Sequence, residues 1–500
     1  MRLFFQKTKW SFGFLFVAAL LLLLAGHSSA PAKNREQWGR QGKQYEELTE
    51  ALLSGRLSLT EEPAAFLAEL ENPYDPAARD NAAREQDAYY LNDTAYYKGK
   101  YYCYFGLTPA LLLFLPVRLL TGKMLSSWMA VHVVSLLCVP AALFFVSGLR
   151  RRFAKDAGNG TVLLLSGLLL SFLGLPYLTA FCTSYSLPTV TGLALLMAGT
   201  GCFLRAEGED GGFRRSFLAA GAVLYALTIG CRPLYVLSFL LLFPLFSGAI
   251  RRGAFFRKEG EGAKNTVCVL LPALALAALF LGYNALRFGS PLEFGFRFLL
   301  TTRDMLHGTK SAAAVADSLY LLAFQAPRLN GTFPFLHGTE VSASVREHLY
   351  VEPLLGGFFG LHPALLIVLL VSGALLLWRY FRGQKNGGQS ENPTAGKTGV
   401  TAFAAVSAVI GLVILLADAV LAGVSQRYAA DFALFFFIPF ACVMLRVKKN
   451  HRRILPFALA VLLVLELFLS AGTVLSDGRY YCMRDWNTAV YESIASFFTK

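Results

Sequence analysis

The chain has 500 residues, of which 55% are hydrophobic and only 16% are charged, with a formal net charge of +14. This composition excludes a set of soluble domains, which need a larger share of polar and charged surface. The basic residues are scattered in small clusters at the ends of apolar runs, where they orient helices in a bilayer. No nucleic-acid partner is therefore expected.

The N-terminal apolar run, residues 11–29, follows Arg2, Lys7 and Lys9, which predicts a cytoplasmic N-terminus and a first helix that runs outwards. Residues 1–30 are thus a first transmembrane helix or a signal anchor. Small residues at 26–30 leave cleavage as a signal peptide open. In both cases residues 31–125 lie outside.

Within this outer segment, residues 107–120 form an apolar run that is too short for a span and contains Pro109 and Pro116. We expect an interfacial helix there.

The chain is expected to have about eleven transmembrane helices, which are the first helix and ten later spans. The ten spans are expected near 126–149, 161–178, 184–204, 216–231, 234–250, 266–286, 354–378, 401–423, 428–445 and 454–474.

These spans form two groups of transmembrane helices, at 126–286 and 354–474. A second outer loop at 287–353 separates them, and an outer tail at 475–500 follows.

Five loops between these spans are basic, and the interfacial assignment of 107–120 places all five on the cytoplasmic side. Their basic residues are Arg150, Arg151, Arg152 and Lys155; Arg205, Arg214 and Arg215; Arg251, Arg252, Arg257, Lys258 and Lys264; Arg379, Arg382, Lys385 and Lys397; and Arg446, Lys448, Lys449, Arg452 and Arg453. If residues 107–120 crossed the bilayer, every one of these loops would lie outside. The sequence therefore predicts an all-α, multi-pass protein of the plasma membrane, with membrane lipids around its helices and with extended outer loops.

The first outer segment contains four candidate catalytic carboxylates, followed by a tyrosine-rich stretch at 96–104. They are Asp75, Asp80, Asp87 and Asp93. A carboxylate beside a lipid surface has a raised pKa unless it is paired, and it can accept a proton from a hydroxyl group. The alternative for each is a solvated loop carboxylate, and for the tyrosines an aromatic belt at the headgroup level.

Two more acids lie within expected spans, Asp418 near an outer end and Glu466 near the middle of the last helix. An unpaired charge at this depth costs several kcal/mol, so both are expected to need a partner or a wet cavity.

The eight cysteines have no metal-type spacing and mostly lie in or beside apolar runs. They are Cys103, Cys138, Cys182, Cys202, Cys231, Cys268, Cys442 and Cys482. We expect them to be small packing residues. No cofactor is expected, while a requirement for a divalent metal stays open.

Several segments resemble the bacterial GT-C-type membrane glycosyltransferases, and the layout is similar to that of dolichyl-phosphate-mannose protein mannosyltransferases. The first segment is Tyr96-Tyr97-Lys98-Gly99-Lys100-Tyr101-Tyr102, continued by Tyr104-Phe105-Gly106 and Pro109 before the short helix. The others are Gly230-Cys231-Arg232-Pro233, Tyr283-Asn284-Ala285-Leu286-Arg287-Phe288-Gly289-Ser290-Pro291 and Gln426-Arg427-Tyr428.

The resemblance implies that a sugar moves, with inversion, from a polyprenyl-phosphate carrier to an acceptor on the outer face, and that an acid of the first outer segment is the general base. Asp75 and Asp93 are favoured, with Asp80 and Asp87 as alternates. The chain lacks the Asp-Glu or Asp-x-Asp pair that is common in this group. The expected substrate-binding residues are Arg79, Lys100, Tyr102, Arg232, Arg427 and Tyr428.

Arg232 and Arg427 are cations at outer helix ends, where a bidentate guanidinium suits the carrier phosphate. Their alternative role is simple snorkelling or pairing with a neighbouring carboxylate. For the whole chain, a transporter or flippase, a ligase of lipid-linked sugars, and a non-catalytic assembly subunit stay open as alternative functions.

Overall fold

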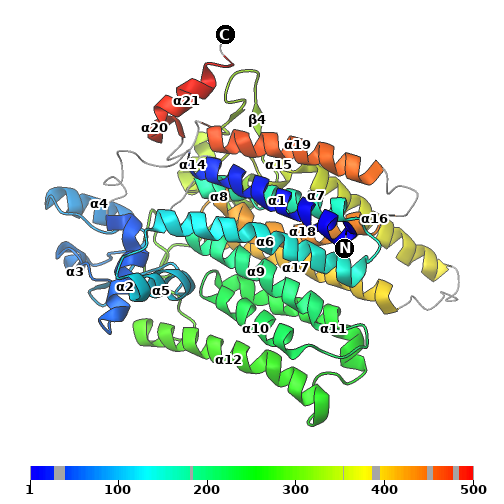
Figure 1. Ribbon diagram of the computed structural model, residues 1–500. Helices are drawn as coiled ribbons and strands as arrows, with labels where there is room; N and C mark the ends of the chain where they lie inside the picture. The colour runs from blue at the N-terminus through cyan, green and yellow to red at the C-terminus, as the bar shows by residue number, and fades with distance from the viewer. Residues whose placement is uncertain are drawn as a thin grey trace.

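The computed structural model describes residues 2–27, 40–180, 184–352, 354–385, 395–447, 454–476 and 483–498. The fold is a bundle of apolar helices that run roughly side by side, with most of the small helices gathered at one end (Figure 1). The prediction of an all-α membrane protein is confirmed. The proposed cleavage site lies largely outside the described residues, as does part of the C-terminal tail.

Seven helical segments of the described chain are long and apolar enough to cross a membrane. They are α6 (Ser127–Phe153), α9 (Ser186–Ala206), η3 with α11 (Pro233–Arg251), α12 (Gly260–Phe288), Gly399–Leu421 of α17 (Ala395–Leu421), η4 with α18 (Gln426–Leu445) and α19 (Ile454–Leu475). The other four expected spans fall on shorter apolar helices. They are Gly13–Gly26 of α1 (Arg2–His27), α7 (Asn159–Phe172), α10 (Arg215–Ile229) and Pro363–Trp378 of α16 (Pro363–Lys385).

The segment expected at 161–178 is divided because Gly174 has a φ of 60° and interrupts the helix between α7 and α8 (Leu175–Ala180). The expected interfacial helix consists of a π-helical turn, η2 (Ala110–Phe114), followed by α5 (Leu115–Thr121). Twelve helical residues extend about 18 Å, well short of the roughly 30 Å of a hydrocarbon core.

The centre of the bundle is formed by α9 and α18, and its periphery by α12 and α19. In the most apolar window of α9, 89% of residues are buried, against 11% in α12 and in α19. Glycines of α9 allow close packing: a Cβ at Gly192 would lie 2.7 Å from the Tyr235 ring, and one at Gly199 equally close to Tyr225. In lipid, where apolar area does not drive association, such small residues permit tight helix contacts.

One end of the bundle carries the first outer segment, with η1 (Arg40–Lys43), α2 (Gln44–Leu53), α3 (Phe66–Glu69) and α4 (Pro76–Glu85). A hairpin of β1 (Thr94–Tyr97) and β2 (Lys100–Tyr102) follows. Lys98 and Gly99 have φ values of 49° and 71°, the left-handed geometry of a tight two-residue turn. The second outer loop adds β3 (Leu299–Leu300), so that the sheet order is β2-β1-β3 and all pairs are antiparallel. The sequence analysis predicted helices alone and did not predict this sheet, which joins the two outer segments.

The rest of the second outer loop contains α13 (Ala312–Ala323), β4 (Arg328–Leu329), β5 (Leu336–His337) and α14 (Ala343–His348), and α15 (Phe358–Leu361) precedes α16. The C-terminal α20 (Met483–Trp486) and α21 (Thr488–Ala495) lie near β4 in Figure 1.

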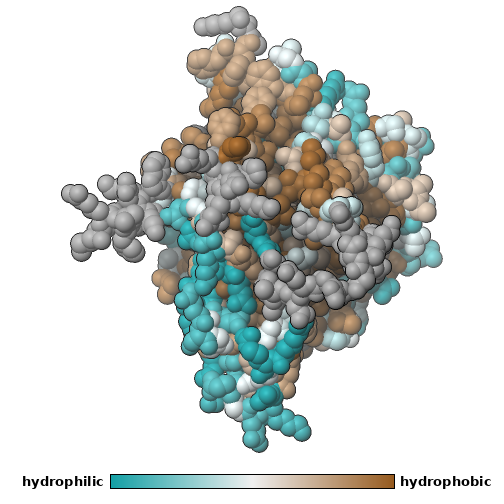
Figure 2. Space-filling model, turned by 90° about the vertical axis from the view of Figure 1, so that its right-hand side faces the viewer, coloured by the Kyte–Doolittle hydropathy of each residue, from teal (hydrophilic) through white to brown (hydrophobic). Residues whose placement is uncertain are grey.

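The opposite end holds three of the basic loops, which ion pairs connect. Glu207 accepts from Arg152 and, at 2.7 Å, from Arg252, and Arg215 pairs with Glu261. Figure 2 views this end, where hydrophilic side chains gather mainly in the lower half. These three loops therefore lie on one side, as the charge pattern requires.

Candidate active site

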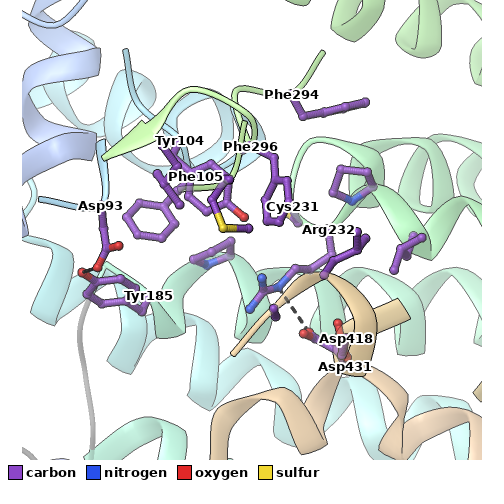
Figure 3. Close-up of a pocket in the computed structure, with 18 of the residues that line it drawn as sticks. Asp93, Tyr104, Phe105, Tyr185, Cys231, Arg232, Phe294, Phe296, Asp418 and Asp431 are labelled. Carbon is purple, nitrogen blue, oxygen red and sulfur yellow. Dashed lines mark hydrogen bonds and ion pairs between the residues drawn. The ribbon is translucent and has the colours of Figure 1, made fainter. Parts of the chain in front are cut away.

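The four segments that carry the family resemblance meet around a cavity of about 520 Å³ at the end of the bundle that holds the sheet (Figure 3). Two glycines bring the first two segments together: a Cβ on Gly106 would overlap the carbonyl oxygen of Gly230. Beside them, the Thr108 N–H donates to that same oxygen at 2.9 Å. Backbones this close leave no room for side chains, so both motifs need glycine.

The third segment, residues 283–291, contacts the first segment through Arg287. Arg287 of α12 is buried, donates to the carbonyl of Cys103 at 2.9 Å and to Asn284 Oδ1 at 2.8 Å, and lies over the Tyr283 ring. The cation therefore fixes the chain just before Tyr104, which lines the cavity.

Asp93 lies in the cavity wall immediately before β1. Its φ of 52° is left-handed, which is uncommon for a residue other than glycine and costs free energy that the surroundings must supply. The surroundings hold it on both sides: its N–H donates to Leu300 at 2.6 Å, and Gln44 donates to its carbonyl at 3.1 Å. Strained residues of this kind cluster at functional sites.

The Asp93 carboxylate accepts a hydrogen bond from the Tyr185 hydroxyl, just before α9. Burial, followed by the charge of Asp93, raises the pKa of Tyr185 well above its usual value. The phenol thus keeps its proton and remains the donor, which fixes one carboxylate oxygen of Asp93.

Arg232 occupies the middle of the cavity and pairs with Asp431 of α18 at 3.2 Å. It also donates to Thr189 of α9 at 2.7 Å, while Tyr235 donates to the same carboxylate at 3.2 Å. The guanidinium is thereby oriented by α9 and α18, and Tyr235 fixes the carboxylate that it pairs with.

Arg427 of η4 pairs with Glu352 at 3.1 Å and lies 4.7 Å from the centre of the Tyr185 ring. Arg427 therefore packs on the ring of Tyr185, whose hydroxyl donates to Asp93. Tyr428 lines the cavity next to it. Burial raises the pKa of Tyr104, which lines the cavity together with Asp93, Arg232, Arg427 and Tyr428. These four predicted site residues therefore share one cavity lining.

The other predicted site residues are not brought to this cavity. Asp75 caps α4, accepting from the Ala77 N–H at 2.9 Å, and Asp80 accepts from Tyr90 at 2.6 Å. Asp87 is an exposed turn residue with a φ of 46°. Asp75 and Asp87 thus have the turn or helix-end roles that the sequence left open, whereas Asp80 lies within α4 and binds a neighbouring tyrosine.

The remaining predicted binding residues also lie outside the cavity lining. Arg79 is buried and donates to the carbonyls of Pro73 and Thr301. Lys100 is exposed on β2, and Tyr102 packs against Phe288, with ring centres 5.3 Å apart.

Sequence reasoning did not single out Tyr185, Glu352, Arg303 or Asp431, which also line the cavity. Asp431 had a usable signal, because it is a carboxylate within the expected span 428–445. Of the two acids that did receive attention, Glu466 is bonded to His362 at 2.8 Å, and Asp418 lines the cavity.

Within the described part of the chain, no group of three or more His, Cys, Asp or Glu side chains is placed to hold a metal ion. The side chains that line the cavity supply carboxylates, guanidinium groups and phenols. A carboxylate next to fixed cations suits proton abstraction from a hydroxyl beside a departing anion.

No family model matches the sequence, and no curated protein matches it. Among solved structures, the chain is similar to ArnT from Cupriavidus metallidurans, whose crystal structure was determined bound to undecaprenyl phosphate. The match covers 98% of this chain and 69% of that chain, with 13% sequence identity and a TM-score of 0.45. Similarity at this level assigns neither an activity nor a substrate to this chain.

Proposed function

We propose that the chain is a GT-C-type glycosyltransferase that transfers a sugar from a polyprenyl-phosphate carrier to an acceptor hydroxyl at the outer membrane surface. The observation that carries this proposal is the convergence of Asp93, Arg232 and Arg427 on one cavity at the sheet end of the bundle. The four segments that resemble this enzyme group meet at the same place.

Asp93 is the general base in this proposal. Its carboxylate takes the proton of the acceptor hydroxyl while that oxygen attacks the anomeric carbon, and the bond from this carbon to the carrier phosphate breaks. One displacement from the opposite face inverts the anomeric centre. An alcohol is a poor nucleophile at neutral pH, so a positioned base contributes a rate factor of about a hundred to ten thousand.

The departing polyprenyl phosphate needs stabilisation of its negative charge more than it needs a proton. Fixed cations supply this without reorganisation during the reaction. Arg232 and Arg427 are held by Asp431 and Glu352, and we assign them to the phosphate. One carboxylate then suffices, whereas hydrolysis of a glycoside commonly uses two.

The deciding experiment is transfer of a radiolabelled sugar from polyprenyl phosphate by the purified full-length protein. We expect label to leave the lipid fraction and appear on an added acceptor, with loss of activity in Asp93→Asn. A transporter or flippase would bind the donor without consuming it, and an assembly subunit would do neither. Donor left intact across a panel of polyprenyl-phosphate sugars would reject the enzyme assignment.

The same proposal places the cavity on the outer face of the plasma membrane and the N-terminus in the cytoplasm. Both ends of the 107–120 segment contact α2, since Tyr45 donates to the carbonyl of Gly106 and Arg118 pairs with Glu50. A cysteine at Lys123 should react with an impermeant reagent in intact cells, and one at Gly158 should be protected. The reverse labelling would overturn the orientation and with it the active face.

A further inference from the structure

The cavity has a second polar end, which the proposed chemistry does not use. Asp93 and Tyr185 lie on one side, Arg232 in the middle, and Asp418 of α17 beneath Arg232 (Figure 3). Asp418 lies three residues before the end of its helix, at Leu421, so its side chain reaches the cavity from the helix that also carries Ile414 and Leu421 of the lining.

Asp418 differs from the other carboxylates of the lining because one of its oxygens, Oδ2, is buried without a hydrogen-bond partner. The others are occupied as follows: Asp93 by Tyr185, Asp431 by Arg232 and Tyr235, Glu352 by Arg427 and Ser425, and Glu293 by the Gly295 N–H at 2.7 Å. A buried acceptor left unpartnered is costly, and in native proteins it calls for an explanation.

The cations near Asp418 are engaged elsewhere. Its charged neighbours are Asp431, Arg232 and Lys310. Arg232 is bound to Asp431 and Thr189, and Lys310 donates to the carbonyls of Ala419, at 2.8 Å, and Ala422 at the end of α17. Lys310 thus ties the second outer loop to the helix end rather than neutralising the acid.

We propose that Asp418 binds hydroxyl groups of the donor's sugar and so selects a hydroxylated sugar over the bare carrier phosphate. This inference rests on the proposed transferase function. A carboxylate offers acceptors only, which match sugar hydroxyl donors and repel the phosphate. A site built around such a hydrogen bond strongly rejects an analogue that lacks the hydroxyl, because its own polar group is then left unpaired.

The test compares two probes, polyprenyl phosphate and polyprenyl-phosphate-linked neutral hexoses, on full-length protein in nanodiscs. Wild type should bind at least one hexose donor more tightly than the bare carrier. Asp418→Ala should reduce that donor's affinity roughly ten- to a hundredfold and change bare-carrier binding by less than about threefold. Asp418→Asn, which keeps one acceptor, should lose less. Unchanged bare-carrier binding also shows that the variants fold.

Asp75→Asn is the matched control, because Asp75 caps α4 outside the cavity and Asn is an equally good cap. Equal losses for both probes, no loss for the hexose donor, or a wild-type protein that binds both probes equally tightly would each overturn the assignment of Asp418. Failure of the proposed function looks different, since wild type would then bind neither probe or would leave every donor unconsumed.

Discussion

Two regions of the molecule bury charged or titratable side chains among apolar helices, and they do so differently. His362 and Glu466 bond to each other at 2.8 Å, with the imidazole between the rings of Phe172 and Phe358. The cavity at the sheet end of the bundle holds Asp93 in a strained conformation, has Arg427 stacked on Tyr185, and leaves Asp418 Oδ2 unpartnered. A polar pair that satisfies itself stabilises the fold, whereas groups left incomplete around a cavity are suited to a ligand.

The largest effect should come from Asp93→Asn, which keeps the shape of the side chain and removes the basic oxygen. We expect the rate of sugar transfer to fall by about a hundred- to ten-thousandfold while donor binding and the unfolding temperature stay nearly unchanged. Asp75→Asn is the control and should keep transfer within about threefold of wild type. Equal transfer rates in the two variants would mean that Asp93, like the helix-capping Asp75, has only a structural role.

Arg427→Gln should weaken binding of the donor by roughly 1–3 kcal/mol, the usual worth of a hydrogen bond to a charged group. The substitution also leaves Glu352 buried without its partner, so protein stability should fall. Adding Glu352→Gln should restore stability without restoring binding, which separates the two effects in an equilibrium binding assay. Arg427→Lys should recover binding only in part, because the planar fork is lost. If the double variant bound the donor normally, Arg427 would have only a structural role, like the His362–Glu466 pair.

Glu466 should behave in the opposite way. Glu466→Gln retains an acceptor for His362, so transfer should stay within about twofold of wild type. Glu466→Leu leaves the imidazole buried without that partner, and the free energy of unfolding should drop by about 1–3 kcal/mol, as judged from thermal unfolding in detergent. A large loss of transfer in Glu466→Gln at wild-type stability would show that this pair takes part in the chemistry.

The sequence predicted the bundle because apolar length and the distribution of basic residues are local signals. It expected Arg232 and Arg427 at helix ends and named Tyr428 as a binding residue, and all three line the cavity. It could not choose among the four carboxylates of the first outer segment, because that choice depends on contacts across the chain. Asp93 is held by Leu300 and Tyr185, which are far from it in sequence, whereas Asp75 and Asp80 are engaged by near neighbours.

The smallest effect concerns Asp304, which joins the two outer segments through Asn72. It accepts hydrogen bonds from Asn72 at 2.8 Å and from the backbone of Leu306 and His307. Burial alone would raise the pKa of this carboxyl, but the hydrogen bonds from Asn72 and His307 outweigh it and lower the pKa to about 2, from 3.8. A lowered pKa means that the folded state binds its proton less readily than the unfolded state. The stabilisation is therefore complete above about pH 4 and is lost as the pH falls through 2.

Pepsin cleavage of the outer segments should accordingly increase between pH 4 and pH 2 in wild type. Asp304→Asn should be cleaved more readily already at pH 4 and should show a weaker pH dependence, while Asp317→Asn, in the same outer loop, serves as the control. A variant that follows the wild-type curve would show that the junction of the two outer segments does not depend on this carboxylate.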